Sequence, residues 1–226
     1  MMLHVPQVLG PSELAQARSL LARAPWVDGA ITAGHQSVKV KHNEQLPGDC
    51  AEARELGMLI ARALQASPLF MAAALPREVF PPLFNRYGVG MSFGSHVDNA
   101  LRGLPGSGQK LRTDLSATLF LTDPADYDGG ELVIEDTYGD HAVKLPAGDL
   151  ILYPSTSLHR VTPITRGARV SSFFWIQSLV RDDAKRSILF DLDAANMQLT
   201  TEVPESPALV MLTSVYHNLL RQWAEP

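Results

Sequence analysis

Between residues 83 and 177 the chain repeats short runs of alternating apolar and polar residues, and this pattern restricts the possible folds more than any other feature. Turn-forming residues such as Gly, Pro and Asp separate the runs. Alternation is expected of strands that bury one face, and evenly spaced short strands are typical of an antiparallel sandwich or barrel. Eight such strands suit a double-sheet jelly roll. The predicted strands cover residues 83–88, 92–98, 114–121, 131–135, 141–145, 149–153, 159–164 and 169–177.

Helical periodicity flanks this region on both sides. We expect a first helix that Ser12 caps and that ends before Pro25, and further helices over residues 49–66, 68–75, 182–195 and 208–224. A short strand is expected over residues 37–41. The sequence therefore predicts an α+β fold with a jelly-roll (double-stranded β-helix) core over 78–178. An N-terminal helical region over 1–77 would pack on this core, and a C-terminal helical region over 179–226 would extend it.

Charge and cysteine content exclude several classes of protein. The formal net charge of −5 argues against a nucleic-acid binder, which needs a basic face. The single cysteine, Cys50, excludes an internal disulfide framework and a cysteine-based zinc site. Residues 1–10 lack the pattern of a signal peptide, and the longest apolar run, residues 69–75, is too short to span a bilayer. We therefore expect a soluble, cytoplasmic protein that binds neither nucleic acid nor membrane.

Three residues have the side chains and the placement of a metal site. On a strand, His96 and Asp98 would point to the same face, because side chains alternate. The pair alone is a common chance occurrence, but His159 begins another predicted strand. Two histidines and one carboxylate that leave coordination positions open are the facial triad of non-haem Fe(II) oxygenases. The isolated His35 and His42 are expected to be solvated or locally hydrogen-bonded.

Arg169, ten positions after His159, is the predicted site for an acidic co-substrate. A guanidinium group pairs with a carboxylate in a two-pronged, permanently charged contact, which would hold the far end of a 2-oxo acid chelated to the metal. Ser171, Phe173 and Trp175 share its face of the strand, where the aromatic rings would exclude water. An ordinary surface role for Arg169 is the alternative. Residues 99–112 form the longest gap between strands, and they are either a flexible connection or a lid beside the metal.

Several short motifs together resemble the prolyl 4-hydroxylase-like Fe(II)/2-oxoglutarate dioxygenases, and most closely the bacterial PKHD-type hydroxylases, some of which are associated with iron uptake. The dioxygenase likeness covers about residues 78–178, and the closer likeness extends through the C-terminal helices with the run 216–221. The motifs are Tyr87, Gly94-x-His96-x-Asp98-Asn99, Tyr127-Asp128-Gly129-Gly130-Glu131-Leu132, Pro146-Ala147-Gly148-Asp149, Tyr153-Pro154, Ser157-Leu158-His159-x-Val161-x-Pro163 and Gly167-x-Arg169.

The resemblance implies that His96, Asp98 and His159 bind Fe(II) and that Arg169 binds the distal carboxylate of 2-oxoglutarate with help from Tyr87. It also raises L-ascorbate as an additional cofactor. Collagen-type relatives have a lysine in place of Arg169, so their substrate does not carry over to this chain. The presence of Asp98 argues against the halogenase branch, in which chloride replaces the carboxylate.

The leading hypothesis is a dioxygenase that hydroxylates an unidentified small-molecule or peptide substrate and releases succinate and CO2. The alternative is a non-catalytic or regulatory module that binds Fe(II) and 2-oxoglutarate and is linked to iron homeostasis. A zinc hydrolase with the same ligands is disfavoured, because no obvious general base accompanies them. The last helix carries an apolar stripe that either packs within the chain or forms a homo-oligomer, which we favour. Its residues are Leu212, Val215, Tyr216, Leu219 and Trp223.

Overall fold

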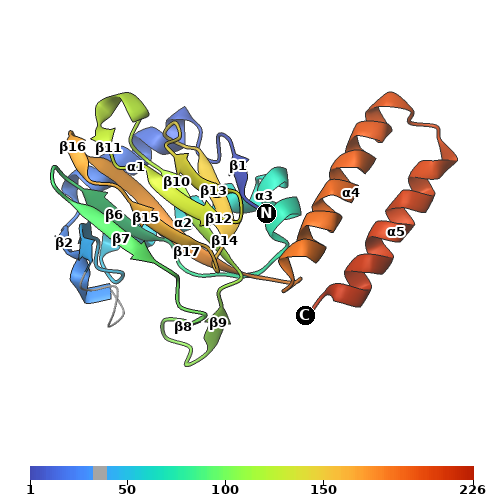
Figure 1. Cartoon of the computed structure of the whole chain (residues 1–226), viewed down its shortest axis with the longest axis horizontal. Coiled ribbons are helices and arrows are strands. Elements are labelled where there is room, and N and C mark those ends of the chain that lie inside the picture. Colours follow the sequence, from blue (N-terminus) through green and yellow to red (C-terminus); the bar gives the residue numbers. More distant parts are fainter. Residues whose placement is uncertain (33–39) are drawn as a thin grey trace.

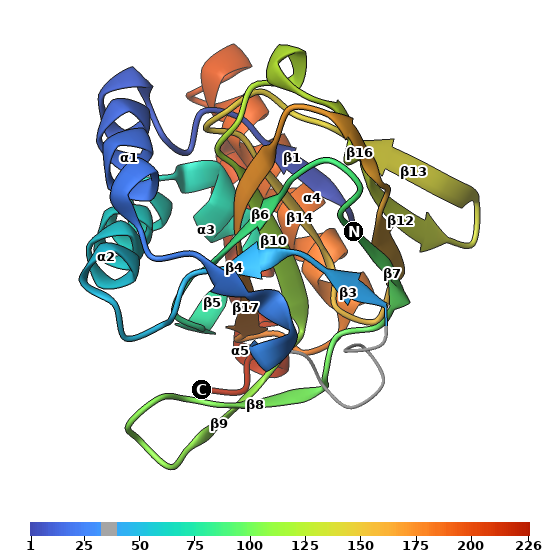
Figure 2. The same cartoon turned by 90° about the vertical axis from the view of Figure 1, so that its left-hand side faces the viewer.

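Two antiparallel sheets face each other at the centre of the computed structural model, which describes residues 1–32 and 40–226 (Figure 1, Figure 2). The larger sheet contains, in spatial order, β1 (Leu3–Val5), β14 (Leu150–Pro154), β10 (Leu115–Phe120), β17 (Arg169–Ser178), β6 (Leu83–Tyr87), β4 (Glu44–Gln45) and β2 (Val27–Asp28), and β5 (Pro76–Val79) pairs with β17. The smaller sheet contains β13 (Gly139–Val143), β12 (Leu132–Asp136), β15 (Leu158–Val161), β7 (Ser92–His96) and β3 (Lys41–His42). The predicted jelly roll is therefore confirmed.

Differences from the predicted strands have local causes. The run 159–164 is two strands rather than one, because Thr162-Pro163 interrupts the ladder and proline has no N–H to donate. Its second part, β16 (Ile164–Arg166), pairs with β11 (Asp128–Gly129). Residues 99–112 contain a two-stranded ribbon, β8 (Leu101–Gly103) and β9 (Lys110–Arg112), where we expected a loop. Of the expected strand 37–41, residues 37–39 lie outside the described part, and Lys41 begins β3.

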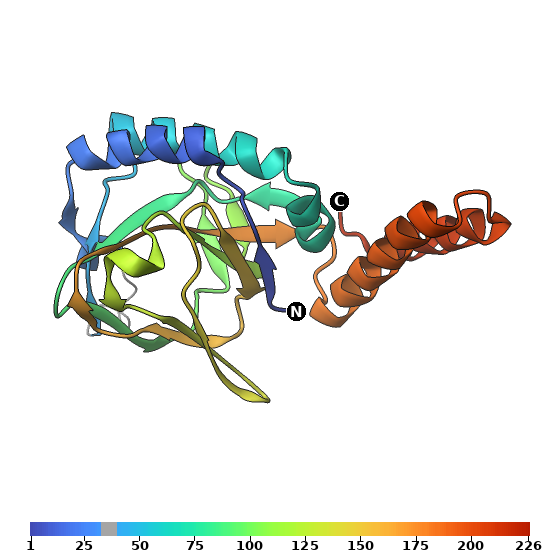
Figure 3. The same cartoon turned by 90° about the horizontal axis from the view of Figure 1, so that it is seen from above.

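Three helices cover the outer face of the larger sheet (Figure 3). They are α1 (Pro11–Arg23), α2 (Ala51–Gln65) and α3 (Pro68–Ala74), and short 3-10 turns occur at Gly29–Thr32 and Pro124–Asp126. The helix α1 begins two residues earlier than a Ser12 cap would require, so Ser12 does not cap it. Instead, the Gly10 amide donates to the Glu13 carboxylate at 2.9 Å. Among the described helices none is long and apolar enough alone to cross a membrane, although α2 and α3 together, bent by 84°, pass that test by length and composition.

The main core forms where these helices meet the sheet. The stripe Leu56, Ile60 and Leu64 of α2 is buried against the outward side chains of the larger sheet, such as Leu119 and Phe174. The inward side chains of the same strands meet the smaller sheet in a second apolar cluster. Alternation along one strand thus divides its residues between a structural core and the interior of the jelly roll, where the candidate site lies.

Gly129 occupies a position that other residues cannot adopt without strain. Its φ is +73°, and a Cβ atom there would lie 2.0 Å from the Pro163 carbonyl oxygen. We therefore expect Gly129→Ala to lower the free energy of unfolding by about 2–4 kcal/mol, through backbone strain and the displaced β16 strand. Denaturant unfolding measures the change. Gly48→Ala is the matched control, since a Cβ there meets nothing within 4 Å. Equal stability of the two variants would contradict the expectation.

The C-terminal helices form an antiparallel hairpin that projects from the jelly roll (Figure 1). The first, α4 (Asp183–Glu202), runs past the predicted end at residue 195, and the second is α5 (Pro207–Trp223). Leu189 of α4 is fully buried with Leu75 and Val180. The chain then returns to the ribbon: the Arg112 guanidinium donates to the Glu225 carboxylate at 2.8 Å, and the Glu225 amide donates to the Leu179 carbonyl at 2.7 Å.

The predicted stripe of the last helix divides between two environments. Tyr216, Leu219 and Trp223 pack against the cluster around Leu189, which is the intramolecular role. Val215 is 47% exposed, and so are its neighbours Val210 at 75% and Met211 at 70%. Self-association through this outer face stays a prediction that light scattering on the full chain can test. The mass of a single chain at high concentration would contradict it.

Candidate active site

His96 and His159 are direct cross-strand neighbours, and this register is what creates the site. His96 ends β7 and faces His159 of β15, with their ring centroids 4.2 Å apart. Asp98 follows two residues after His96, just beyond the end of the strand. One ligand atom from each of the three side chains lies within 4.8 Å of the others. The Asp98 Oδ2 atom is 3.8 Å from the His159 Nε2 atom.

Hydrogen bonds orient both imidazole rings in the same way. The His96 Nδ1 atom is 2.8 Å from the Gly94 carbonyl oxygen, and the His159 Nδ1 atom is 3.0 Å from the Ser157 carbonyl oxygen. A carbonyl oxygen only accepts, so each Nδ1 must be the protonated nitrogen that donates. The Nε2 lone pair of each ring is therefore free to bind a metal, as is usual for histidine ligands whose other nitrogen is hydrogen-bonded.

The neutral form of His96 is favoured by its surroundings. Burial, followed by the neighbouring His159, lowers the pKa of His96 to about 4. The Phe93 ring stacks on the imidazole with 3.6 Å between ring centroids. At neutral pH the ring is therefore unprotonated, which is the form that binds a cation.

Asp98 is held by a hydroxyl pair that sequence reasoning missed. The Ser116 hydroxyl donates to the Asp98 Oδ2 atom at 2.6 Å and lies 2.7 Å from the Ser155 hydroxyl. Ser116 and Thr118 are polar residues at alternate positions of the otherwise apolar, fully buried strand β10. That alternation was the available signal, because a buried polar face of a core strand needs partners.

Arg169 is the most deeply buried charge near the site. It begins β17 opposite Tyr87 of β6 and is 1% exposed. Its guanidinium carbon lies 5.4 Å from the Tyr87 ring centroid and 5.2 Å from the Phe120 ring centroid. The Nε and Nη1 atoms have no hydrogen-bond partner among the described residues. Unpaired N–H groups on a buried cation are costly, so this arrangement fits an incoming carboxylate.

The close packing around Arg169 explains the second glycine of the predicted motif. A Cβ atom on Gly130, whose φ is +68°, would lie 2.3 Å from the Ile164 Cδ1 atom and 3.3 Å from the Arg169 Cδ atom. Only a residue without a side chain lets this turn approach the arginine so closely. Gly130 therefore helps to fix the position of the guanidinium group.

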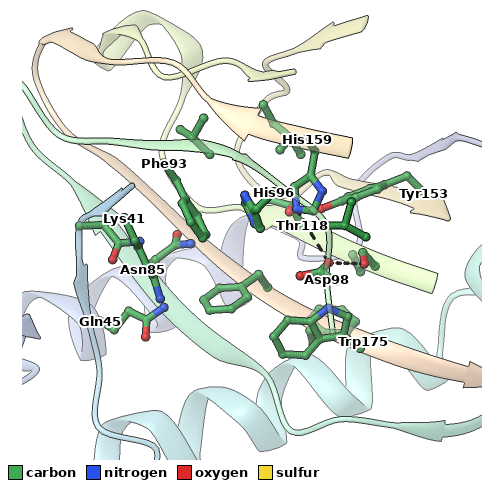
Figure 4. A pocket seen from close by; sticks show the side chains of 18 of the residues that line it. Lys41, Gln45, Asn85, Phe93, His96, Asp98, Thr118, Tyr153, His159 and Trp175 are labelled. Carbon is green, nitrogen blue, oxygen red and sulfur yellow. Dashed lines mark hydrogen bonds and ion pairs between the residues drawn. The ribbon is translucent and has the colours of Figure 1, made fainter. Parts of the chain in front are cut away.

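The three candidate ligands, labelled in Figure 4, line one pocket. Arg169 lines the same pocket. Of the residues predicted on the Arg169 face of β17, Phe173 and Trp175 line this pocket as expected. Ser171 instead donates its hydroxyl to the Asn85 Oδ1 atom at 2.6 Å, so that proton is already engaged. Figure 4 shows Lys41, Gln45 and Asn85 on the far side of Phe93 from the histidines.

The ribbon β8–β9 borders the same pocket. Arg102 of β8 lines it, and its guanidinium carbon stacks 3.7 Å from the Trp175 ring centroid. Lid motion of this segment stays a prediction. Of the isolated histidines, His42 is exposed on β3, as expected of a solvated side chain, and His35 lies outside the described residues.

The three ligands fit Fe(II) by their chemistry and geometry. Two imidazoles and one carboxylate lie together at the edge of a pocket, which leaves room for further ligands. With a metal ion bound, the Asp98 carboxylate and the His159 Nε2 atom, which now lie 3.8 Å apart, would both contact the ion instead of each other. The predicted metal ligands are thus brought together by the fold, and Arg169 with Tyr87 lies at the inner end of the same pocket.

Comparison with known proteins gives matches over nearly the whole chain. Residues 82–177 match the model of the 2OG-Fe(II) oxygenase superfamily, and residues 183–225 match the PKHD-type hydroxylase C-terminal domain. A PKHD-type hydroxylase of Caulobacter vibrioides is 62% identical over 226 residues, covering 100% of both chains. One from Methylobacterium nodulans is also 62% identical over 226 residues, again with 100% of both chains covered.

Solved structures show the same fold at much lower identity. The carbocyclase SnoK from nogalamycin biosynthesis has a TM-score of 0.57 and 16% identity, covering 79% of this chain and 80% of that one. A Pseudomonas putida prolyl-4-hydroxylase has a TM-score of 0.52 and 20% identity, covering 78% of this chain and 92% of that one. Both likenesses support the jelly-roll assignment.

Proposed function

This chain belongs to the PKHD-type hydroxylases, a group within the 2OG-Fe(II) oxygenases, and from that premise we propose that it hydroxylates an unidentified small-molecule or peptide substrate with succinate and CO2 as co-products. Each cycle would convert 2-oxoglutarate, O2 and R–H into succinate, CO2 and R–OH. The observation that carries the proposal is the shared pocket: the three candidate ligands and the buried, partly unpaired guanidinium of Arg169 open into one space.

In this proposal His96, Asp98 and His159 hold the metal. When bound, Fe(II) supplies the redox chemistry that couples oxidative decarboxylation of 2-oxoglutarate by O2 to oxygen insertion into a C–H bond. The Gly94 and Ser157 carbonyls keep the imidazole nitrogens aimed at the metal, and the Ser116 hydroxyl fixes the carboxylate.

The rest of the pocket binds and shields the co-substrate. Arg169 would accept the distal carboxylate of 2-oxoglutarate in a two-pronged contact, and the Tyr87 ring beside it fixes the direction of the guanidinium group. Burial raises the pKa of the Tyr87 phenol, so Tyr87 stays neutral and able to donate to the same carboxylate. Phe93, Phe173 and Trp175 form the apolar walls that keep water from the ligands.

A hydrolase with the same ligands is less well supported. Among the described residues that line the pocket, Asp98 is the sole carboxylate, and it is already a ligand. We further propose a cytoplasmic location, since a free thiol at Cys50 and Fe(II) both suit a reducing compartment.

Product stoichiometry tests the proposed function. The Fe(II)-loaded chain, mixed with 2-oxoglutarate, O2 and a panel of metabolites, should form one succinate for each 2-oxoglutarate consumed, and its true substrate should stimulate this turnover. L-Ascorbate should increase the number of turnovers before inactivation by keeping the iron reduced. Succinate formation that does not depend on added Fe(II) would contradict the proposal, as would binding of 2-oxoglutarate without any turnover under all conditions of the screen.

A further inference from the structure

Two cationic side chains reach the pocket from segments that the metal and co-substrate sites do not use. Lys41 comes from β3 and is 6% exposed, and Arg102 comes from β8 and lies over the Trp175 ring. Lys41 lies beside Phe93, with its Nζ atom 5.6 Å from the ring centroid (Figure 4). Both side chains line the same pocket as His96 and Asp98.

The charges of the proposed cofactor site balance without Arg102. The two positive charges of Fe(II) and the one of Arg169 match the carboxylate of Asp98 and the two carboxylates of 2-oxoglutarate. In the described part of the chain, no carboxylate lies within ion-pair distance of Arg102. A cation that lies on an aromatic ring is well placed to bind an anion, because the ring already excludes water from one face of the cation.

We propose that the substrate of this enzyme is a small organic anion whose carboxylate or phosphate group binds between Arg102 and Lys41. The inference rests on the proposed hydroxylase function and adds the chemical class of the substrate. The rest of the substrate lies against Phe93 and Phe173, beside the metal ligands. The side chains around Lys41 are buried, including Gln45 and Asn85, so the part of the pocket that would hold the anionic group is narrow and suits a small molecule.

The effect of the Arg102 charge on Lys41 supports this placement. Burial, followed by the positive charge of Arg102, lowers the pKa of Lys41 to about 8, while Asp28 opposes the shift. Burial also lowers the pKa of Arg102, and the charge of Asp98 opposes that shift. An oxyanion between the two side chains would offset both their repulsion and their desolvation.

Calorimetric titration of the full chain tests the proposal. The chain is saturated with 2-oxoglutarate and with Mn(II) in place of Fe(II), so that no substrate is consumed. The probes are small acids paired with neutral analogues: 3-phenylpropanoate with 3-phenylpropanamide, and 2-phenylethyl phosphate with 2-phenylethanol. At least one acid should bind about tenfold or more tightly than its neutral partner, as expected for a charge-assisted contact. The carboxylate and phosphate arms then identify the oxyanion.

Arg102→Gln should weaken binding of the preferred acid by roughly 10- to 100-fold, and Arg102→Lys should lose less, since it keeps the charge but not the planar fork. The matched control is Lys110→Gln, which removes an exposed charge from the same ribbon. Lys41→Gln should repeat the effect of Arg102→Gln, and thermal melting checks its fold. Equal affinity for acids and neutral partners overturns the proposal, as does an acid preference that survives in Arg102→Gln. If 2-oxoglutarate itself fails to bind, the proposed function fails instead.

Discussion

Asp98→Ala is expected to lose nearly all Fe(II) binding and at least about 100-fold of 2-oxoglutarate turnover, while the jelly roll stays folded. The variant removes one of three metal ligands and the negative charge among them. The same result is expected for His96→Ala and His159→Ala. Unfolding is not expected, because Ser116 and Ser155 remain paired with each other when the carboxylate is gone. Metal titration, succinate formation and thermal melting of each variant measure the three quantities.

His217→Ala is the matched control for this series, since His217 is an exposed histidine of α5 far from the pocket. It should bind Fe(II) as the unmodified chain does. Turnover at the unmodified rate in any one of the three ligand variants would remove that residue from the site.

Arg169→Ala is expected to weaken 2-oxoglutarate binding by about 2–5 kcal/mol and to leave Fe(II) affinity much less changed. Losing the guanidinium leaves the distal carboxylate of the co-substrate buried without a partner between Tyr87 and Phe120. A thermal shift measures the effect directly: 2-oxoglutarate should raise the melting temperature of the metal-loaded unmodified chain and not that of the variant.

Arg169→Lys should recover part of the affinity, because the charge remains while the two-pronged geometry is lost. Arg181→Ala, at an exposed arginine outside the pocket, serves as the control for loss of charge. Unchanged 2-oxoglutarate affinity in Arg169→Ala would show that the co-substrate is held elsewhere.

The main jelly-roll strands and the closeness of His96 to Asp98 were predictable because both depend on local spacing. Alternation over residues 83–177 predicted the strands, and the two-residue interval from His96 to Asp98 placed both side chains on one side. Helix ends were less predictable. The cap of α1 is Gly10 rather than Ser12, and α4 continues through Thr200 and Thr201, whose hydroxyls donate to carbonyls four residues earlier.

Pocket residues that come from distant segments were not predictable. Lys41 enters because the two-residue strand β3 pairs with β7, and a strand so short has no periodicity to detect. Arg102 lines the pocket because β8 and β9 pair as a ribbon, which places the Arg102 guanidinium group over the Trp175 ring. Both placements depend on strand register across the sheet, which the sequence of one chain does not reveal.

The contact between Arg112 and Glu225 means that the C-terminal helices and the jelly roll are not independent modules. Arg112 lies on β9, paired with Leu101 next to Arg102, and its other hydrogen bonds go to Asp114 at 2.7 Å and to Gln177. The last residues of the chain are therefore part of the scaffold beneath the pocket ribbon. A chimera that exchanges the C-terminal helices between relatives would have to bring a compatible partner for Arg112, so the helices and the ribbon should change together as these proteins diverge.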